Sequence, residues 1–267
     1  AALGYNLAQL LPEPLSISFF TTSGAEAVEA ALKLCERAQG PRRRRFVVTT
    51  NAYHGKTHTA LSLSRTEDFR ESFIQGIPEE LIREVAYGDA EAVISALADD
   101  VIAVIVEPVQ GQGLRVPPPG YLAQVVKAAR ERGILVIFDE VKVGMGRTGT
   151  FCAFQHESVV PDVVTLSKAL GGGTRAIGAM VTSPALFKKA YGRKEEAGLH
   201  STTFGGLGTS CAVAIEALQI IGDPVFLDSV REKGTYLRDR LELLKEKYPK
   251  EIKEIRGRGL LQGIEFN

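Results

Sequence analysis

Short apolar runs alternate along the chain with stretches in which apolar residues recur at helical spacing. The runs are rich in valine and isoleucine, which is typical of strands buried on both faces: FVVTT (46–50), VIAVIVEP (101–108), ILVIFDE (134–140), DVVTLS (162–167) and AIGAMVTS (176–183). Helical patterns lie between them: AEAVEAALKLCERA (25–38), AEAVISALAD (90–99) and YLAQVVKAARERG (121–133). This alternation predicts an α/β fold with a mostly parallel sheet covered by helices on both faces.

The pattern changes after Pro224. Residues 226–248 form one long, charged, amphipathic helical pattern, and RGRGLLQGIEF (256–266) predicts a turn followed by a strand. We therefore expect a large domain over residues 1–224 and the beginning of a smaller α+β domain over residues 225–267. Because the chain begins inside a helical pattern and ends on GIEFN, which resembles a strand, we expect both ends to continue in a longer protein.

Composition and charge narrow the class of protein. The chain is 45% hydrophobic and 24% charged, which is ordinary for a soluble globular protein. Lysine plus arginine and aspartate plus glutamate number 32 each, and this balance argues against a protein built to bind nucleic acid or an anionic membrane. These residues show no signal-peptide pattern and no apolar run long enough to span a membrane. Cys35, Cys152 and Cys211 are too far apart to indicate a disulfide framework, so we expect a reducing cytoplasm.

One basic block interrupts this balance, the run Arg42 to Arg45 just before the first predicted strand. We interpret it as a solvated loop that leads into the strand, and an anion contact is the alternative.

Three predicted strands end on chemically active side chains. Asp139 and Glu140 follow one apolar run, Glu107 follows another, and Lys168 follows a third. Sites in parallel sheets form at the carboxyl ends of the strands, so these side chains are candidates for one site. A single charged residue at a strand end is ordinary, since strands must end in solvent. The sequence alone does not prove that these ends converge.

The stretch TTSGAEAVEAALKL (21–34) places Ser23 at the start of a helix, with Glu26 three residues later. This spacing is typical of a capping box, in which the serine and the glutamate bind the free amides of the first turn. The same free amides and the helix dipole also favour a bound phosphate. Both interpretations can hold together.

The stretch NAYHGKT (51–57) brings Tyr53 and His54 to a strand exit. An aromatic side chain there can pack in the core or stack on a planar ligand. His54 and His58 are four residues apart, as in some metal pairs, but HGKTH lacks the glutamate of a zinc-protease helix, and its glycine weakens a helix. We therefore expect no metal.

Lys168 and Asp139 form the most informative pair. A desolvated lysine near other cations has a lowered pKa and can form a Schiff base with an aldehyde. A carboxylate beside a pyridine nitrogen keeps that nitrogen protonated and makes the ring a better electron acceptor. Together with a phosphate cradle and a stacking aromatic, these two residues indicate a site for pyridoxal 5′-phosphate (PLP).

With these motifs in order, the chain resembles the class III aminotransferases of the acetylornithine and ω-amino acid type, which have PLP fold type I. The resemblance covers nearly the whole chain and is carried by FFTTSGAEAVEAALKL, YHGKT, VEPVQGQG, FDEVKVGMGRTGTF, PDVVTLSKALGGG, HSTTFGG and IRGRGLLQGIE. The stretch from Asp139 to Gly173 is the most specific part.

The resemblance implies roles for residues around the cofactor ring. Lys168 would form the Schiff base and shuttle a proton, and Asp139 would pair with the pyridine nitrogen. Val141 would pack on one face of the ring and Tyr53 on the other, with His54 beside Tyr53.

The resemblance also implies a phosphate site and a second subunit. The phosphate would be held by Ser23, Gly24 and Ala25, largely through backbone amides. Thr203 would reach the phosphate of the neighbouring subunit in a homodimer. Glu107 would belong to the hydrogen-bonded shell behind the ring.

Two positions depart from the family pattern. Lys142 replaces the usual glutamine that binds the phenolic oxygen of the cofactor; an ammonium there would favour the charged oxygen and alter the proton affinity of the imine. Gln112 replaces a glutamate that, in some relatives, forms an ion pair with a carboxylate-binding arginine. That arginine would lie beyond residue 267, and the N-terminal segment that shapes the substrate entrance would also lie outside this chain.

The sequence therefore predicts a PLP-dependent aminotransferase with ping-pong kinetics. By family analogy, the donor would be a terminal amine such as an ornithine derivative, a diamine or an ω-amino acid, and the acceptor a keto acid. One alternative is a PLP decarboxylase or aminomutase on the same scaffold. Another is a non-catalytic, truncated or degenerate family member. A nucleotide-binding protein is disfavoured, because no GxGxxG or Walker A motif follows the strands.

Overall fold

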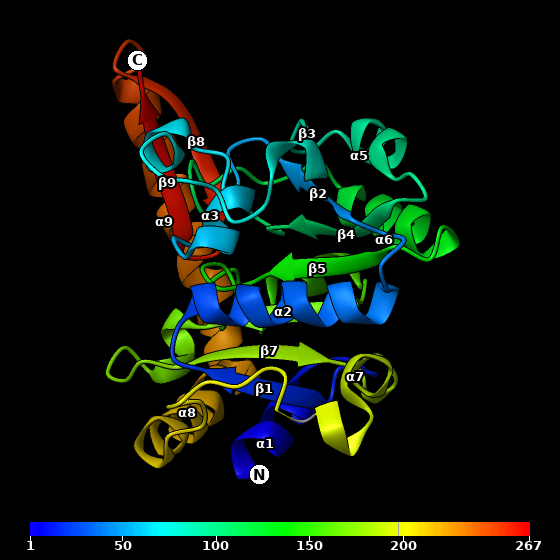
Figure 1. The fold of residues 1–267 in the computed structure, drawn as a ribbon. Helices are drawn as coiled ribbons and strands as arrows, with labels where there is room; N and C mark the ends of the chain where they lie inside the picture. The colour runs from blue at the N-terminus through cyan, green and yellow to red at the C-terminus, as the bar shows by residue number, and fades with distance from the viewer. Residues whose placement is uncertain (197) are drawn as a thin grey trace.

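The computed structural model describes residues 1–196 and 198–267. Its centre is a seven-stranded sheet in the order β1-β7-β6-β5-β4-β2-β3 (Figure 1). The strands are β1 (Ile17–Thr21), β2 (Arg45–Thr49), β3 (Ile82–Val85), β4 (Val101–Val106), β5 (Leu135–Asp139), β6 (Val163–Leu166) and β7 (Gly178–Thr182). The sheet is parallel except for β7, which runs antiparallel to both β1 and β6. The predicted α/β fold with a mostly parallel sheet is confirmed.

Helices cover both faces of this sheet. The helices are α1 (Ala2–Leu10), α2 (Gly24–Gln39), α3 (His58–Leu63), α4 (Glu67–Arg70), α5 (Ala90–Ala96), α6 (Tyr121–Glu131), α7 (Pro184–Tyr191), α8 (Gly208–Ile221) and α9 (Pro224–Lys247). Short 3₁₀ turns occur at η1 (Glu79–Leu81), η2 (Ala153–Glu157), η3 (Lys168–Gly171) and η4 (Lys194–Glu196).

Alternate residues of each strand enter two separate hydrophobic cores, because successive strand side chains point to opposite faces. Val104 and Val106 of β4 pack with α1, α5, α6 and α8 on one face. Ala103 and Ile105 pack with α2, α3 and α7 on the other face, where α2 lies across the sheet in Figure 1. The ends of the central strands β4, β5 and β6 are therefore fixed by buried contacts on both sides.

The five predicted strands and the helical patterns 25–38, 90–99, 121–133 and 226–248 are all present, with ends that differ by a few residues. The N-terminal helical pattern forms α1. The strands β1, β3 and β8 and the helices α3, α4, α7 and α8 were not predicted.

The C-terminal residues form a hairpin beside α9 (Figure 1). Its strands β8 (Ile252–Arg258) and β9 (Leu261–Phe266) pair antiparallel in a sheet of their own. The segment RGRGLLQGIEF, predicted to form a turn and a strand, contains the end of β8, a turn at Gly259 and Leu260, and β9. The boundary between two domains near residue 224 stays a prediction.

The arginine run leads into β2 as a loop, as interpreted from the sequence, but two of its members make specific contacts. The Arg43 guanidinium donates to the carbonyls of Val101 at 2.8 Å and Arg132 at 2.9 Å. Arg45 pairs with Asp100. These two arginines therefore tie the run to neighbouring carbonyls and to the Asp100 carboxylate, whereas Arg42 and Arg44 are exposed.

Among the described residues, no single helix is long and apolar enough to cross a membrane; α8 and α9, bent by 66° at their junction, meet the length and composition criteria only as a pair.

Candidate functional site

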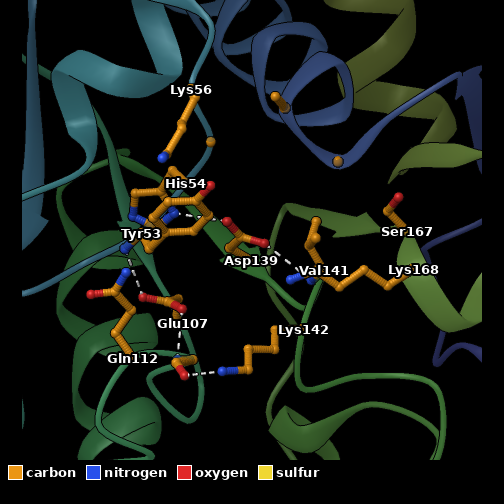
Figure 2. A pocket seen from close by; sticks show the side chains of 14 residues that line it. Tyr53, His54, Lys56, Glu107, Gln112, Asp139, Val141, Lys142, Ser167 and Lys168 are labelled. Carbon is orange, nitrogen blue, oxygen red and sulfur yellow. Dashed lines mark hydrogen bonds and ion pairs between the residues drawn. The ribbon is translucent and has the colours of Figure 1, made fainter. Parts of the chain in front are cut away.

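A cavity of about 330 Å³ opens where the carboxyl ends of β4, β5 and β6 meet the beginning of α2 (Figure 2). It is lined by Gly24, Ala25, Tyr53, His54, Gly55, Lys56, Glu107, Gly111, Gln112, Asp139, Val141, Lys142, Ser167 and Lys168. All of the predicted site residues except Ser23 and Thr203 are in this set. The ends of β4, β5 and β6 therefore converge on one cavity, which the sequence alone did not prove.

Asp139 is the last residue of β5, and its carboxylate is held on both oxygens. Oδ2 lies 2.7 Å from Nδ1 of His54, and Oδ1 accepts hydrogen bonds from the Val141 N–H at 3.0 Å and the Thr165 hydroxyl at 3.1 Å. Figure 2 shows the carboxylate between His54 and Val141. Because Asp139 is only 4% exposed, these partners fix the direction in which it meets a ligand.

The backbone of His54 is also anchored, since its main-chain N–H donates to the Ser64 hydroxyl at 2.9 Å. Within residues 1–196 and 198–267, its buried Nε2 atom has no hydrogen-bond partner. His58 lies apart from it, exposed at the start of α3. Among all the residues that the structure describes, no group of three or more His, Cys, Asp or Glu side chains could hold a metal ion.

Lys168 lies two residues after the end of β6 and begins η3 with a left-handed backbone, φ 48°. Its side chain extends into the cavity towards Asp139 (Figure 2). Burial lowers the pKa of Lys168 below its ordinary value; Asp139 and Glu107 oppose this effect, while Lys142 and Arg147 reinforce it. Gly172 and Gly173, at φ 58° and 73°, then turn the chain back towards β7. The site therefore holds an amine that is more easily deprotonated than a surface lysine.

The N-terminus of α2 forms the wall of the cavity next to Val141. Ser23 is the N-cap, and its hydroxyl accepts the Glu26 N–H at 3.2 Å, as predicted. The predicted return bond of the capping box is different: the Glu26 carboxylate accepts the N–H and hydroxyl of Thr22, each at 2.6 Å, rather than the Ser23 N–H. Ser23 is therefore occupied by capping, and only Gly24 and Ala25 face the cavity.

Gly24, the first residue of α2, packs closely against Val141. A Cβ at position 24 would lie 2.6 Å from Cγ1 of Val141, so only glycine allows the start of α2 to approach the loop after β5. The first N–H groups of a helix have no intrahelical acceptor and carry the positive end of its dipole. This wall of the cavity therefore suits an anion.

Glu107 follows β4 and forms the back wall. Its carboxylate accepts the Tyr53 N–H at 3.1 Å and the Gly111 N–H at 2.8 Å. Burial raises the pKa of Glu107 to about 7; His54 lowers it in part, and Asp139 adds to the rise. Lys142, across the cavity floor, donates to the Gly111 carbonyl.

Three residues in or beside the cavity, Lys56, Phe69 and Thr66, were not predicted to take part. The Lys56 ammonium lines the cavity and lies 4.1 Å from the centre of the Phe69 ring. Phe69 in turn packs edge-on against Tyr53, with ring centres 5.8 Å apart. Thr66 donates to the Gln112 side chain at 3.1 Å. Lys56 could have been identified from the sequence, because it lies three residues after Tyr53, the predicted stacking aromatic.

Thr203 is exposed in the loop before α8 and does not line the cavity. Its contact with a neighbouring subunit stays a prediction.

The model of the family described as aminotransferase class-III matches residues 1–267 of this chain. The chain belongs to the class-III aminotransferase family. Solved structures of similar proteins agree with this. The ornithine aminotransferase from Toxoplasma gondii is 34% identical with a TM-score of 0.91, over 100% of this chain and 63% of that one.

Two transaminases extend the comparison. The (S)-enantioselective ω-transaminase from Thermomicrobium roseum is 30% identical with a TM-score of 0.92, over 99% of this chain and 64% of that one. The ω-transaminase from Pseudomonas jessenii, solved in complex with PMP, is 29% identical with a TM-score of 0.90, over 99% and 64% of the two chains. This class-III chain therefore spans a little under two thirds of the length of these relatives.

Proposed function

We propose that this class-III chain acts as a PLP-dependent aminotransferase that moves an amino group from a terminal-amine donor to a keto acid. The observation that carries the proposal is the convergence, in one cavity, of the Lys168 amine, the Asp139 carboxylate and the start of α2 at Gly24. Two further observations support the proposal. The chain belongs to the class-III aminotransferase family, and another structure of the Toxoplasma gondii ornithine aminotransferase has PLP at its active site.

The residues present fit PLP. The closely packed Gly24 and the free amides of α2 leave room and polarity for a phosphate. Asp139, anchored by His54 and Thr165, can face a protonated ring nitrogen. Tyr53 and Val141 supply an aromatic and an apolar surface for a planar ring.

PLP, when bound, supplies an aldehyde that captures amines and a ring that accepts electrons from the adjacent carbon. Lys168, with its lowered pKa, would hold the group through its amine until a donor amine displaces it. The freed Lys168 amine would then move a proton between the substrate carbon and the C4′ carbon of PLP. Asp139 would keep a proton on the ring nitrogen, and Glu107 would hold the wall formed by Tyr53 and Gly111.

The charges in the cavity support a substrate that carries a carboxylate. Lys56, Lys142 and Lys168 line it together with the carboxylates of Glu107 and Asp139, and Lys56 is exposed and lies near Tyr53 and His54 in Figure 2. A donor with an amine at one end and a carboxylate at the other, such as an ornithine derivative or an ω-amino acid, suits this arrangement. We extend the proposal to a cytoplasmic homodimer in which Thr203 reaches the partner's site.

The test compares the wild type with Lys168→Ala, and with Lys189→Ala as a control on the exposed surface of α7. The wild type and the control should bind PLP and show imine absorbance, and borohydride should fix the label on the peptide containing Lys168. Lys168→Ala should lose the imine absorbance and the borohydride label while remaining folded. Donor alone should convert bound PLP to pyridoxamine phosphate.

The alternatives predict different products. Release of carbon dioxide from the donor would favour a decarboxylase, and an isomerised donor would favour an aminomutase. A folded wild type that takes up no PLP, both at this length and when extended to the length of its relatives, would contradict the proposal and favour a non-catalytic protein.

A further inference from the structure

Lys142 completes a chain of hydrogen bonds around the cavity wall. Its ammonium donates to the Gly111 carbonyl, and the Gly111 N–H donates to Glu107 at 2.8 Å. The other oxygen of Glu107 accepts the Tyr53 N–H at 3.1 Å. Figure 2 shows this chain running from Lys142 through Glu107 to Tyr53. Lys142 therefore joins the segments that follow β2, β4 and β5.

The stem of Lys142 is also held in place. A Cβ on Gly111 would lie 2.7 Å from Cδ of Lys142 and 3.0 Å from Glu107, so the lysine stem lies directly against the Gly111 backbone. A long side chain that is packed along its stem and bonded at its end keeps its charge at one place. The ammonium is thus a fixed positive charge on the wall of the cavity.

That charge acts on Lys168, which lines the same cavity. The groups that act on Lys168 are the carboxylates of Asp139 and Glu107 and the cations of Lys142 and Arg147. Burial lowers the pKa of Lys168 most, the carboxylates oppose it, and the Lys142 charge lowers it further. Since only a neutral amine attacks an aldehyde, a fixed cation at position 142 increases the reactive fraction of Lys168 at neutral pH.

We propose that Lys142 is a positioning residue, whose anchored ammonium holds the Glu107–Gly111 wall and keeps the Lys168 amine in its reactive form. The inference rests on the proposed function, because it takes Lys168 as the reactive amine. It gives the lysine after Asp139-Glu140-Val141 a task that a neutral side chain could not perform.

The experiment measures Lys168 in the protein without PLP. The wild type, Lys142→Gln, Lys142→Met and Lys142→Arg are treated with a small amine-reactive anhydride between pH 6 and 10. Labelling of Lys168 is quantified by peptide mass spectrometry, with the exposed Lys189 as an internal standard. The two neutral variants should label Lys168 about three times more slowly at pH 7.5, with the midpoint of the pH profile moved upwards. Lys142→Arg should resemble the wild type.

Several results would overturn the inference. These are an unchanged Lys168 profile in the neutral variants, an arginine variant that behaves like them, and neutral variants that fail to fold while Lys142→Arg folds. The last two would leave Lys142 a purely structural role. The readout does not depend on the cofactor: a wild type that binds no PLP would refute the proposed function, while a shifted Lys168 profile would still support the role of Lys142.

Discussion

The loops that follow β4 and β5 are each anchored by one buried glutamate, yet only one of the two meets the cavity. Glu107 and Glu140 both accept two backbone N–H groups, and burial raises the pKa of each to about 7. Glu107 lines the cavity and binds Gly111, four residues further along. Glu140 is 0% exposed and reaches Ala153 at 3.0 Å and Phe154 at 2.8 Å, closing a much longer loop.

A buried carboxylate with a raised pKa therefore does not have to contact a ligand. The two hydrogen bonds of Glu140 close the loop that begins with Val141 and Lys142. The two hydrogen bonds of Glu107 hold a wall of the cavity. Substitution of Glu140 should therefore mainly reduce stability, whereas substitution of Glu107 should mainly reduce PLP affinity.

The largest effect is expected for Glu140→Ala. The substitution leaves the amides of Ala153 and Phe154 without an acceptor in a closed interior, and it should lower the free energy of unfolding by about 4 kcal/mol. Urea unfolding measures this loss. The fraction that remains folded should bind PLP with ordinary affinity. A variant of normal stability that fails to bind PLP would show that Glu140 acts on the cavity.

The pH dependence of Glu140→Gln should be the next largest effect. In the unfolded chain Glu140 loses its proton near pH 4.5, but in the folded protein it keeps the proton up to about pH 7. The folded state therefore binds more protons between these values, and this glutamate makes the wild type less stable as pH rises from 4.5 to 7, with no further change above that. Relative to the wild type, Glu140→Gln should gain up to about 3 kcal/mol between pH 5 and pH 8. A difference that is constant over this range would contradict the raised pKa.

Glu107→Ala should show the opposite balance. Water in the cavity can solvate the amides of Tyr53 and Gly111, so the loss of stability should be about 1 kcal/mol. The unanchored wall should reduce PLP affinity about tenfold, as measured by absorbance titration. Equal losses of stability in Glu107→Ala and Glu140→Ala would remove the distinction between the two loops.

The smallest effect tests a single hydrogen bond. Thr165→Val removes the hydroxyl that donates to Asp139, while Thr182→Val removes a comparable buried hydroxyl that donates to the Asp162 carbonyl, away from the cavity. Both should lose about 1 kcal/mol of stability. Only Thr165→Val should weaken PLP binding, about threefold. Equal PLP affinities in the two variants would show that Asp139 does not depend on this bond.

The sequence predicted the central strands because both of their faces are buried. All six residues of β4 are enclosed, so the run is apolar without interruption. The edge strand β3, with the sequence IREV, has one buried residue and pairs only with β2, so it carried no such signal. The direction of β7 was also undetermined. It reverses because its connection from β6 contains only the short turn η3, whereas a parallel return needs a longer crossover.

The candidate site followed the same rule. Asp139, Glu107 and Lys168 stand at strand ends, so the sheet itself brings them together, and their grouping could be anticipated. The contacts of Lys56 with Phe69 and of Gln112 with Thr66 depend on how the irregular segment around α4 packs. No periodicity in the sequence encodes that packing.

The backbone of Lys168 has a consequence for variation at this position. Its left-handed conformation costs a residue with a side chain about 1 kcal/mol, and glycine or asparagine would adopt it more easily. Selection for heat resistance alone would therefore favour replacing the side chain that the proposed reaction uses as its amine. A library screened only for stability should be enriched in inactive chains with changes at this position, and a lineage released from functional selection should lose this lysine early.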